Sequence, residues 1–211
     1  MSNFGWHFVG KKLRDGRSIP RDGVWLEHDG PIVICRSGLH GSRRPWNALH
    51  YAPGTVLCRV EFGEVVEEHS DKLVARKRRI ICRTDITDTL HYFKRMRALS
   101  VAHLWTPDDV VLEYLITGDE HIKDSAWTSS LVAAKAAWDA AWDSSQDASW
   151  DAAWAARAAA RAASGDDALD AAMDAALAAR AAAYDAAIDK AGIEFDSLVY
   201  EQFGMGGNDA E

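Results

Sequence analysis

The sequence predicts an α+β fold, in which a small, mixed, β-rich N-terminal domain is followed by a long Ala-rich antiparallel helical hairpin. Short β-branched and aromatic runs, separated by turn residues, fill the first part of the chain. In contrast, 30 alanines fall among the 66 residues from 126 to 191, and Ala is the strongest helix former. We therefore expect an α+β domain over 1–124, the hairpin over 125–192 and a C-terminal tail over 193–211.

The distribution of charge supports the same division. The 211-residue chain has a net charge of −8, but residues 1–125 contain 19 Lys and Arg against 17 Asp and Glu, whereas residues 126–211 contain 5 against 15. All eight histidines and all three cysteines also lie before residue 126. Such a change of composition is typical of a boundary between two differently built regions.

Five strands are expected before about residue 83, because β-rich runs alternate with Gly, Pro and Asp turn residues. They are residues 6–9, 24–26, 32–35, 55–62 and 79–83. Between the third and fourth, Pro45 stands where the first turn of a helix accepts proline, and helix formers follow it up to Pro53. This pattern predicts a short helix over 45–52 that packs on the sheet.

Beyond Asp85 the apolar residues recur at helical spacing, which predicts helices over about 86–104 and 107–117. Thr106 is the expected N-cap of the second helix, and Gly118 is expected to end it.

The Ala-rich region carries tryptophans at multiples of four residues. They are Trp138, Trp142, Trp150 and Trp154. A continuous helix is expected from about 125 to 163, followed after Gly165 by a second helix that ends at Ala191 and Gly192. The two helices should approach through Ala faces, with the tryptophans and larger apolar residues wedged between them, against the N-terminal domain or against another copy. We take the four tryptophans as interface residues and expect a homo-oligomer, while a helical stalk is the alternative.

Several classes of protein are excluded or disfavoured. The longest apolar runs are only a few residues, far short of the about 20 that span a bilayer, so no membrane association is expected. No secretory signal is visible, which predicts a cytoplasmic location. The three cysteines, Cys35, Cys58 and Cys82, are odd in number and lie in apolar contexts, so we expect buried free thiols.

A basic run over residues 72–83 raises the question of nucleic-acid binding. Its cations are Lys72, Arg76, Lys77, Arg78, Arg79 and Arg83. A strand would divide them between two faces, and acidic residues directly upstream would neutralise part of them, so nucleic acid is not an expected partner.

A ligand site is expected around the turn at Gly38. Arg36, His40, Arg43 and Arg44 surround this glycine, and such donors at the end of a strand suit a phosphate or nucleotide, although a solvated basic loop is the alternative. Cys35, His40 and His50 lack the paired spacing of metal ligands. Neither a metal nor another cofactor is therefore expected.

A family resemblance covers nearly the whole chain. It is carried by residues 37–40 (SGLH), 45–51 (PWNALHY), 58–61 (CRVE), 63–66 (GEVV) and 71–76 (DKLVAR), and it extends through 103–105 (HLW) and 114–120 (YLITGDE) into the Ala-rich region. These segments resemble an uncharacterised domain of unknown function that is common in phages and prophages. A looser similarity to ADP-ribosyltransferases lies in the Gly and His strand followed by an Ala- and Tyr-bearing helix. The glutamate motif and the His-Gly-Thr motif of that fold are missing.

These observations favour a non-enzymatic phage or prophage accessory protein that binds a nucleotide-like or ADP-ribose-like signal, or a host protein, and self-associates through its Ala-rich helices. Its ligand-binding residues are predicted to be Arg36, Gly38, His40, Tyr51 and Lys72. Counter-defence in the host cytoplasm is the role that the resemblance implies. One alternative is an ADP-ribosyltransferase-like enzyme that uses NAD, with Glu61 or Glu64 placed against His40, and another is a purely structural protein.

Overall fold

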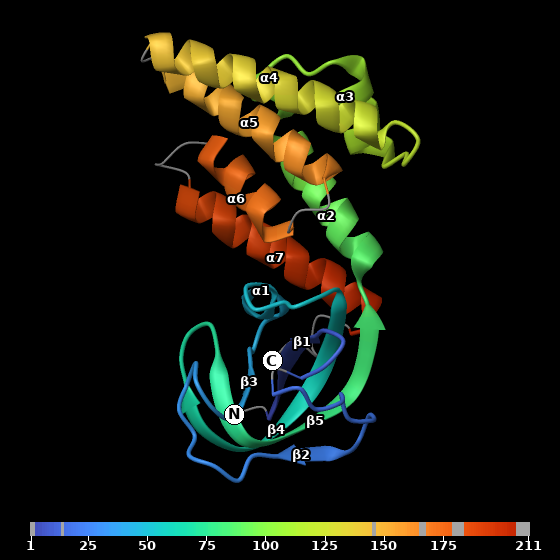
Figure 1. Cartoon of the computed structure of the whole chain (residues 1–211), viewed down its shortest axis with the longest axis vertical. Coiled ribbons are helices and arrows are strands. Elements are labelled where there is room, and N and C mark those ends of the chain that lie inside the picture. The colour runs from blue at the N-terminus through green and yellow to red at the C-terminus, as the bar shows by residue number, and fades with distance from the viewer. Residues whose placement is uncertain (1–2, 14, 145–146, 165–167, 179–183, 206–211) are drawn as a thin grey trace. The chain divides into compact units, whose positions relative to one another are not determined.

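The chain forms two compact units in the computed structural model, which describes residues 3–13, 15–144, 147–164, 168–178 and 184–205. The first unit comprises residues 1–87 and 195–211, and the second comprises residues 88–194. An antiparallel sheet dominates the first unit and helices form the second, so the predicted α+β class is confirmed (Figure 1). The composition boundary near residue 125 thus differs from the division by contacts, because the helices that begin at residue 87 pack with the Ala-rich helices.

The sheet of the first unit is built around a long hairpin. Its strands are β1 (Phe4–Val9), β2 (Trp25–Glu27), β3 (Leu39–Gly41), β4 (Val56–Glu68) and β5 (Leu73–Asp85). All pairs are antiparallel, in the order β1-β4-β5-β2, and β3 pairs with β5 beside β2. The two 13-residue strands β4 and β5 curve strongly along their length (Figure 1).

This curvature brings the two edges of the sheet together. Trp6 of β1 and Ser42, directly after β3, exchange two backbone hydrogen bonds of 2.8 and 3.0 Å. The ring of Phe62, which is 1% exposed, lies between these edges, against Gly5 of β1 and Gly41 of β3. A Cβ atom at Gly41 would lie 2.5 Å from the ring of Phe62, so this close approach of strand and ring requires glycine.

The helix α7 (Tyr184–Gln202) contributes its last two turns to the first unit. Phe195 and Val199 are fully buried there, and the ring of Phe203 lies 4.9 Å from that of Trp6. The predicted helix end at Ala191 and Gly192 and the predicted tail over 193–211 are therefore wrong as far as Gln202. Burial of one large apolar side chain contributes about 1.5–3 kcal/mol, which offsets the about 1 kcal/mol cost of a glycine inside a helix.

The strand predicted over 32–35 is also wrong. Val33 and Ser37 pair across a turn, and Cys35 within it has a φ angle of 67°. The chain then enters β3, where Leu39 is buried, whereas Val33 of the apolar run is 45% exposed. The short helix is confirmed as α1 (Pro45–Leu49), with Pro45 at its first position.

The second unit begins with α2 (Thr87–Ser100), a 3₁₀ turn (Ala102–Leu104) and α3 (Asp109–Thr117). Asp108 rather than Thr106 is the N-cap of α3, and Gly118 ends this helix in the left-handed conformation, as expected. The Ala-rich helices that follow are α4 (Lys123–Ser144), α5 (Asp147–Ala163) and α6 (Ala168–Ala178).

The continuous helix expected over 125–163 is instead two helices, because α4 and α5 run back along each other (Figure 1). The sequence between them, Ser144 to Asp147, interrupts the alanines with residues that are weak helix formers and favour helix starts. Trp138 of α4 lies 5.1 Å from both Trp150 and Trp154 of α5, measured between ring centroids. Folding back therefore pairs the tryptophans within the chain.

Alanines form the contact surface of the second unit, as expected. Ala155, Ala158, Ala159 and Ala162 of α5 pack in one core with residues of α2, α3 and α6. The larger apolar residues of α6 were expected between the helices, against the N-terminal domain or against another copy. Met173 and Leu177 are exposed, and six alanines of this helix are buried. Small side chains permit closer helix approach than Met or Leu would. Within the described residues, no helix is both long and apolar enough to cross a bilayer.

Candidate functional site

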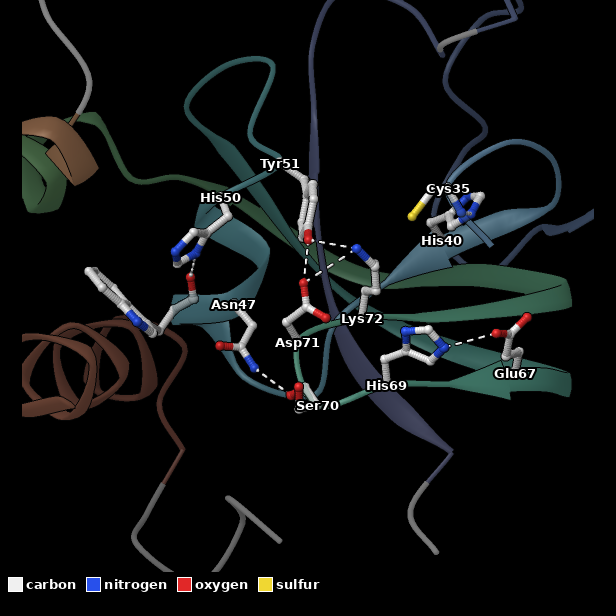
Figure 2. A network of polar contacts seen from close by, with 11 residues as sticks. Cys35, His40, Asn47, His50, Tyr51, Glu67, His69, Ser70, Asp71 and Lys72 are labelled. Carbon is white, nitrogen blue, oxygen red and sulfur yellow. Dashed lines mark hydrogen bonds and ion pairs between the residues drawn. The ribbon is translucent and has the colours of Figure 1, made fainter. Parts of the chain in front are cut away.

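Three predicted site residues meet at one edge of the first unit (Figure 2). Tyr51 follows α1, and its hydroxyl donates a hydrogen bond to Asp71, in the turn between β4 and β5. Lys72 Nζ lies 3.2 Å from the Tyr51 hydroxyl and 3.5 Å from the Asp71 carboxylate. His40 of β3 and Cys35 lie next to this triad (Figure 2). We call these five residues the Tyr51 network.

The charges of the network are fixed by its own contacts. The hydrogen bond to Asp71 raises the pKa of Tyr51, and the same bond lowers the pKa of Asp71. Hydrogen bonds to Tyr51 and to the Cys35 thiol raise the pKa of Lys72. At neutral pH the network therefore holds a neutral phenol, a carboxylate and an ammonium, which suits binding by hydrogen bonds and charge rather than proton transfer.

An aromatic face is available beside these charges. The Tyr51 residue is 51% exposed, and Lys72 Nζ lies 5.3 Å from the centre of its ring. An exposed ring next to a cation is a combination that stacks on flat ligands and attracts anions.

The turn at Cys35 connects His40 to the network. The backbone N–H of Cys35 donates to His40 Nε2 at 2.9 Å, so Nε2 is the acceptor nitrogen of this imidazole. Cys35 is exposed, and so is Cys82, which corrects the expectation of three buried thiols. Cys58 alone is buried, and burial raises its pKa to about 11.

Arg36 and Gly38 belong to the same turn, and among the described residues neither forms a hydrogen bond or ion pair with Tyr51 or Lys72. Gly38 has a φ angle of 110°, and a Cβ there would lie 2.6 Å from Val74, so this glycine is needed by the backbone. The other predicted donors have acidic partners. Arg43 binds Glu68 at 2.8 Å and Arg44 binds Asp196 at 2.7 Å.

Neighbouring hydrogen bonds hold the turn between β4 and β5 against α1. Asn47 Nδ2 donates to the Ser70 carbonyl at 3.1 Å, and the His69 ring bonds Glu67 at 2.8 Å (Figure 2). The sequence identified neither Asp71 nor Asn47 as site residues. Asp71 stands directly before Lys72 in the DKLVAR segment, which is the only pattern that could have identified it.

The basic run of β5 does not form a continuous cationic surface. Its exposed members are paired with acids: Arg76 with Glu64, Lys77 with Glu27 and Glu64, Arg79 with Glu61, and Arg83 with Asp22. Arg78 points inward and is 6% exposed. The cations of the run are thus divided between acidic partners and the inner face of the strand.

His50 is also used within the fold, since its Nδ1 bonds the Trp46 carbonyl at 3.0 Å. Among the described residues, no group of three or more His, Cys, Asp or Glu side chains could hold a metal ion.

The predicted tryptophan interface lies in the second unit, where α4 and α5 form a groove of about 460 Å³. Trp127, Leu131 and Trp138 line one part of it, and Arg157 and Arg161 another. Trp154 is covered by the Arg157 guanidinium, 4.8 Å from the ring centre. The side chain of Trp142 lies outside the described part of the chain.

Comparison with known proteins identifies one domain. Residues 4–92 match a family described as a domain of unknown function, DUF7666. No curated protein and no solved structure matches the chain. The whole Tyr51 network falls inside the matched segment. The chain therefore carries, at residues 4–92, a DUF7666 domain whose function is unknown.

Proposed function

We propose that this chain is a non-enzymatic binding protein whose first unit takes an anionic, nucleotide-like ligand at the Tyr51 network. The observation that carries the proposal is the exposed Tyr51 ring beside the Lys72 ammonium. A base or other flat group would stack on Tyr51, and a phosphate would bind Lys72. Asp71 would accept a hydrogen bond from a ribose hydroxyl.

The enzymatic alternative is less well supported by the same geometry. An ADP-ribosyltransferase-like reaction would require Glu61 or Glu64 to face the ligand near His40. Glu61 instead binds Arg79 at 2.7 Å, and Glu64 lies within 3.8 Å of Arg76 and 3.5 Å of Lys77. Both carboxylates are thus engaged by cations of β5.

The second unit is proposed to mediate self-association or contact with a host protein. Trp127, Leu131 and Val132 of α4 are exposed, which supports such a contact surface, whereas the tryptophans paired with one another support a structural role for α4 and α5. The proposal also includes a phage or prophage setting and counter-defence by sequestering a signal in the host cytoplasm. The family resemblance alone supports these two parts.

Isothermal titration calorimetry with ADP-ribose and with AMP tests the ligand site. The wild-type chain is expected to bind at least one of these probes. Lys72→Met and Tyr51→Ala are expected to weaken binding about tenfold or more, the equivalent of about 1.4 kcal/mol for each lost interaction. Lys77→Met is the matched control, because Lys77 is a nearby cation of β5 that pairs with Glu27 and does not contact Tyr51 in the described hydrogen bonds.

Two results would contradict the proposal: no heat of binding for either probe, or equal weakening by Lys77→Met. Mass analysis of the recovered probe separates binding from catalysis. An unchanged ADP-ribose mass supports the binding protein, whereas a cleaved or transferred product obtained with NAD would support the enzyme.

A further inference from the structure

Arg78 is the buried cation of the first unit, and its surroundings are apolar. It lies on β5 directly opposite Phe62 of β4 and Leu26 of β2. It is 6% exposed, while the next cations along the strand, Lys77 and Arg79, face acids on the other side. Alternation along a strand explains why one cation of the basic run is turned inward.

No negative charge compensates this guanidinium. Its one hydrogen bond is to the backbone carbonyl of His40, and no carboxylate of the described residues lies within ion-pair distance of it. The nearby Cys58 thiol is neutral at physiological pH, because burial raises its pKa to about 11. Burial also lowers the pKa of Arg78 to about 10, so Arg78 itself remains charged. An unpaired buried charge is costly, and proteins normally pair such groups.

The Arg78 nitrogens that do not bind His40 are not fully buried. A guanidinium has five N–H donors, and a single carbonyl bond satisfies few of them. One Arg78 nitrogen binds the His40 carbonyl, and the other two are not fully buried, so solvent can reach them. Two of the three Arg78 nitrogens therefore have no hydrogen-bond partner among the described residues.

His7 of β1 lies near enough to Arg78 to be influenced by its charge. It lies opposite Cys58, and its pKa is lowered by burial and by the positive charges of Arg78 and His40. At neutral pH its ring is uncharged and can still donate one N–H.

We propose that Arg78 anchors an oxyanion inside the curled sheet, with the His7 imidazole as a second donor. The shared chemistry is that of a carboxylate, phosphate or sulfate group, which matches the planar fork of a guanidinium. This site adjoins the Tyr51 network, since Arg78 donates a hydrogen bond to the backbone carbonyl of His40. The anion supplies the negative charge that the described residues do not.

Thermal unfolding of the full chain in phosphate, sulfate and acetate, against chloride at equal ionic strength, tests this site. The midpoint is expected to rise with the concentration of at least one oxyanion, since a ligand that binds only the folded state stabilises it. Arg78→Met is expected to abolish this rise, whatever its midpoint in chloride. Arg79→Met should still show the rise in midpoint, because Arg79, the next residue of β5, is already paired with Glu61 of β4.

An NMR titration of His7 in the wild-type chain covers the case in which Arg78→Met fails to fold. A bound anion is expected to raise the pKa of His7, because it offsets the positive charge of Arg78. A rise with inorganic phosphate identifies a phosphate site, and a rise with acetate alone identifies a carboxylate site. If no oxyanion moves either the midpoint or the His7 titration, or if Arg79→Met abolishes the rise, the anion site is refuted and Arg78 serves only to hold β3.

Discussion

His7 and Gly41 show how single residues set the properties of the first unit. His7 is held neutral by burial and by neighbouring positive charges, which place its pKa well below its ordinary value of 6.5. Gly41 allows the Phe62 ring to approach the strand, with 2.9 Å between its would-be Cβ and the Trp6 carbonyl oxygen. Each residue leads to a separate prediction about the stability of the first unit.

His7 should make the first unit less stable in mild acid. At pH values above 6.5 neither the folded nor the unfolded chain protonates this residue, so its contribution to stability is constant. Below 6.5 the unfolded chain binds a proton and the folded chain does not, so the free energy of unfolding falls as pH decreases towards the folded pKa. Denaturant unfolding across this range should show a weaker pH dependence in His7→Gln. His69→Gln is the control, because His69 is exposed. If the stability of His7→Gln depends on pH as strongly as that of the wild-type chain, His7 is not the cause of the acid sensitivity.

Gly41→Ala is expected to destabilise the first unit, because its Cβ would overlap the Phe62 ring at 2.5 Å and overpacking typically costs about 1–3 kcal/mol. Gly54→Ala is the control, since its Cβ would lie 3.4 Å from the nearest atom and its backbone is not left-handed. Chemical denaturation followed by tryptophan fluorescence measures both. Equal stability of the two variants would show that the strand and the Phe62 ring can move apart without a measurable loss of stability.

Among single residues, the sequence predicted that Tyr51, Lys72 and His40 belong to one site, because the family segments contain all three. It could not predict the inward position of Arg78, since alternation shows only that one face of a strand is buried and not which one. Nor could it predict Asp71, whose role depends on the turn that places it beneath the Tyr51 hydroxyl.

Among the elements, the pair α4 and α5 depends on its aromatic contact. Trp138 meets Trp150 at an interplanar angle of 83° and Trp154 at 73°, both edge-to-face arrangements. Trp138→Ala should therefore destabilise the second unit, by less than the about 3–5 kcal/mol that loss of a fully buried aromatic side chain costs, because Trp138 is half-buried. Trp127→Ala should cost much less, because Trp127 is 42% exposed.

Hydrogen exchange of the α4 and α5 amides measures this difference. Faster exchange in Trp138→Ala than in Trp127→Ala is the expected result. If Trp127→Ala exchanges faster, the exposed tryptophan rather than the inner cluster stabilises the helix pair.

The sequence predicted helix content well because the alanines determine it, and α1, α2 and α3 also lie close to their predicted ranges. It did not predict the fold-back of α4 on α5, since helical spacing alone cannot show whether successive tryptophans face an outside partner or one another. The turn at Cys35 was missed for a similar reason: a short apolar run is typical of a strand, and only the pairing of Val33 with Ser37 shows a reversal.

For the whole molecule, the central feature is that residues distant in sequence complete the first unit. The last turns of α7 bury Phe195 and Val199 in the first unit, and Asp196 accepts hydrogen bonds from Trp46 N and Arg44 Nε, each at 2.7 Å. A chain that ends at Glu194 should therefore lose stability in its sheet, although its DUF7666 segment is intact.

Thermal unfolding of this truncated chain checks the expectation, with removal of residues 206–211 as the control. A lower midpoint for the first truncation and an unchanged one for the second are predicted. An unchanged midpoint for both would show that the sheet is stable without the end of α7.

The most direct test of the binding account is an amide NMR titration of the isotope-labelled chain with ADP-ribose. The account predicts saturable shifts concentrated at Tyr51, Asp71 and Lys72, reduced in Lys72→Met. Shifts confined to the groove between α4 and α5, or no shifts at all, would contradict a ligand site at the Tyr51 network.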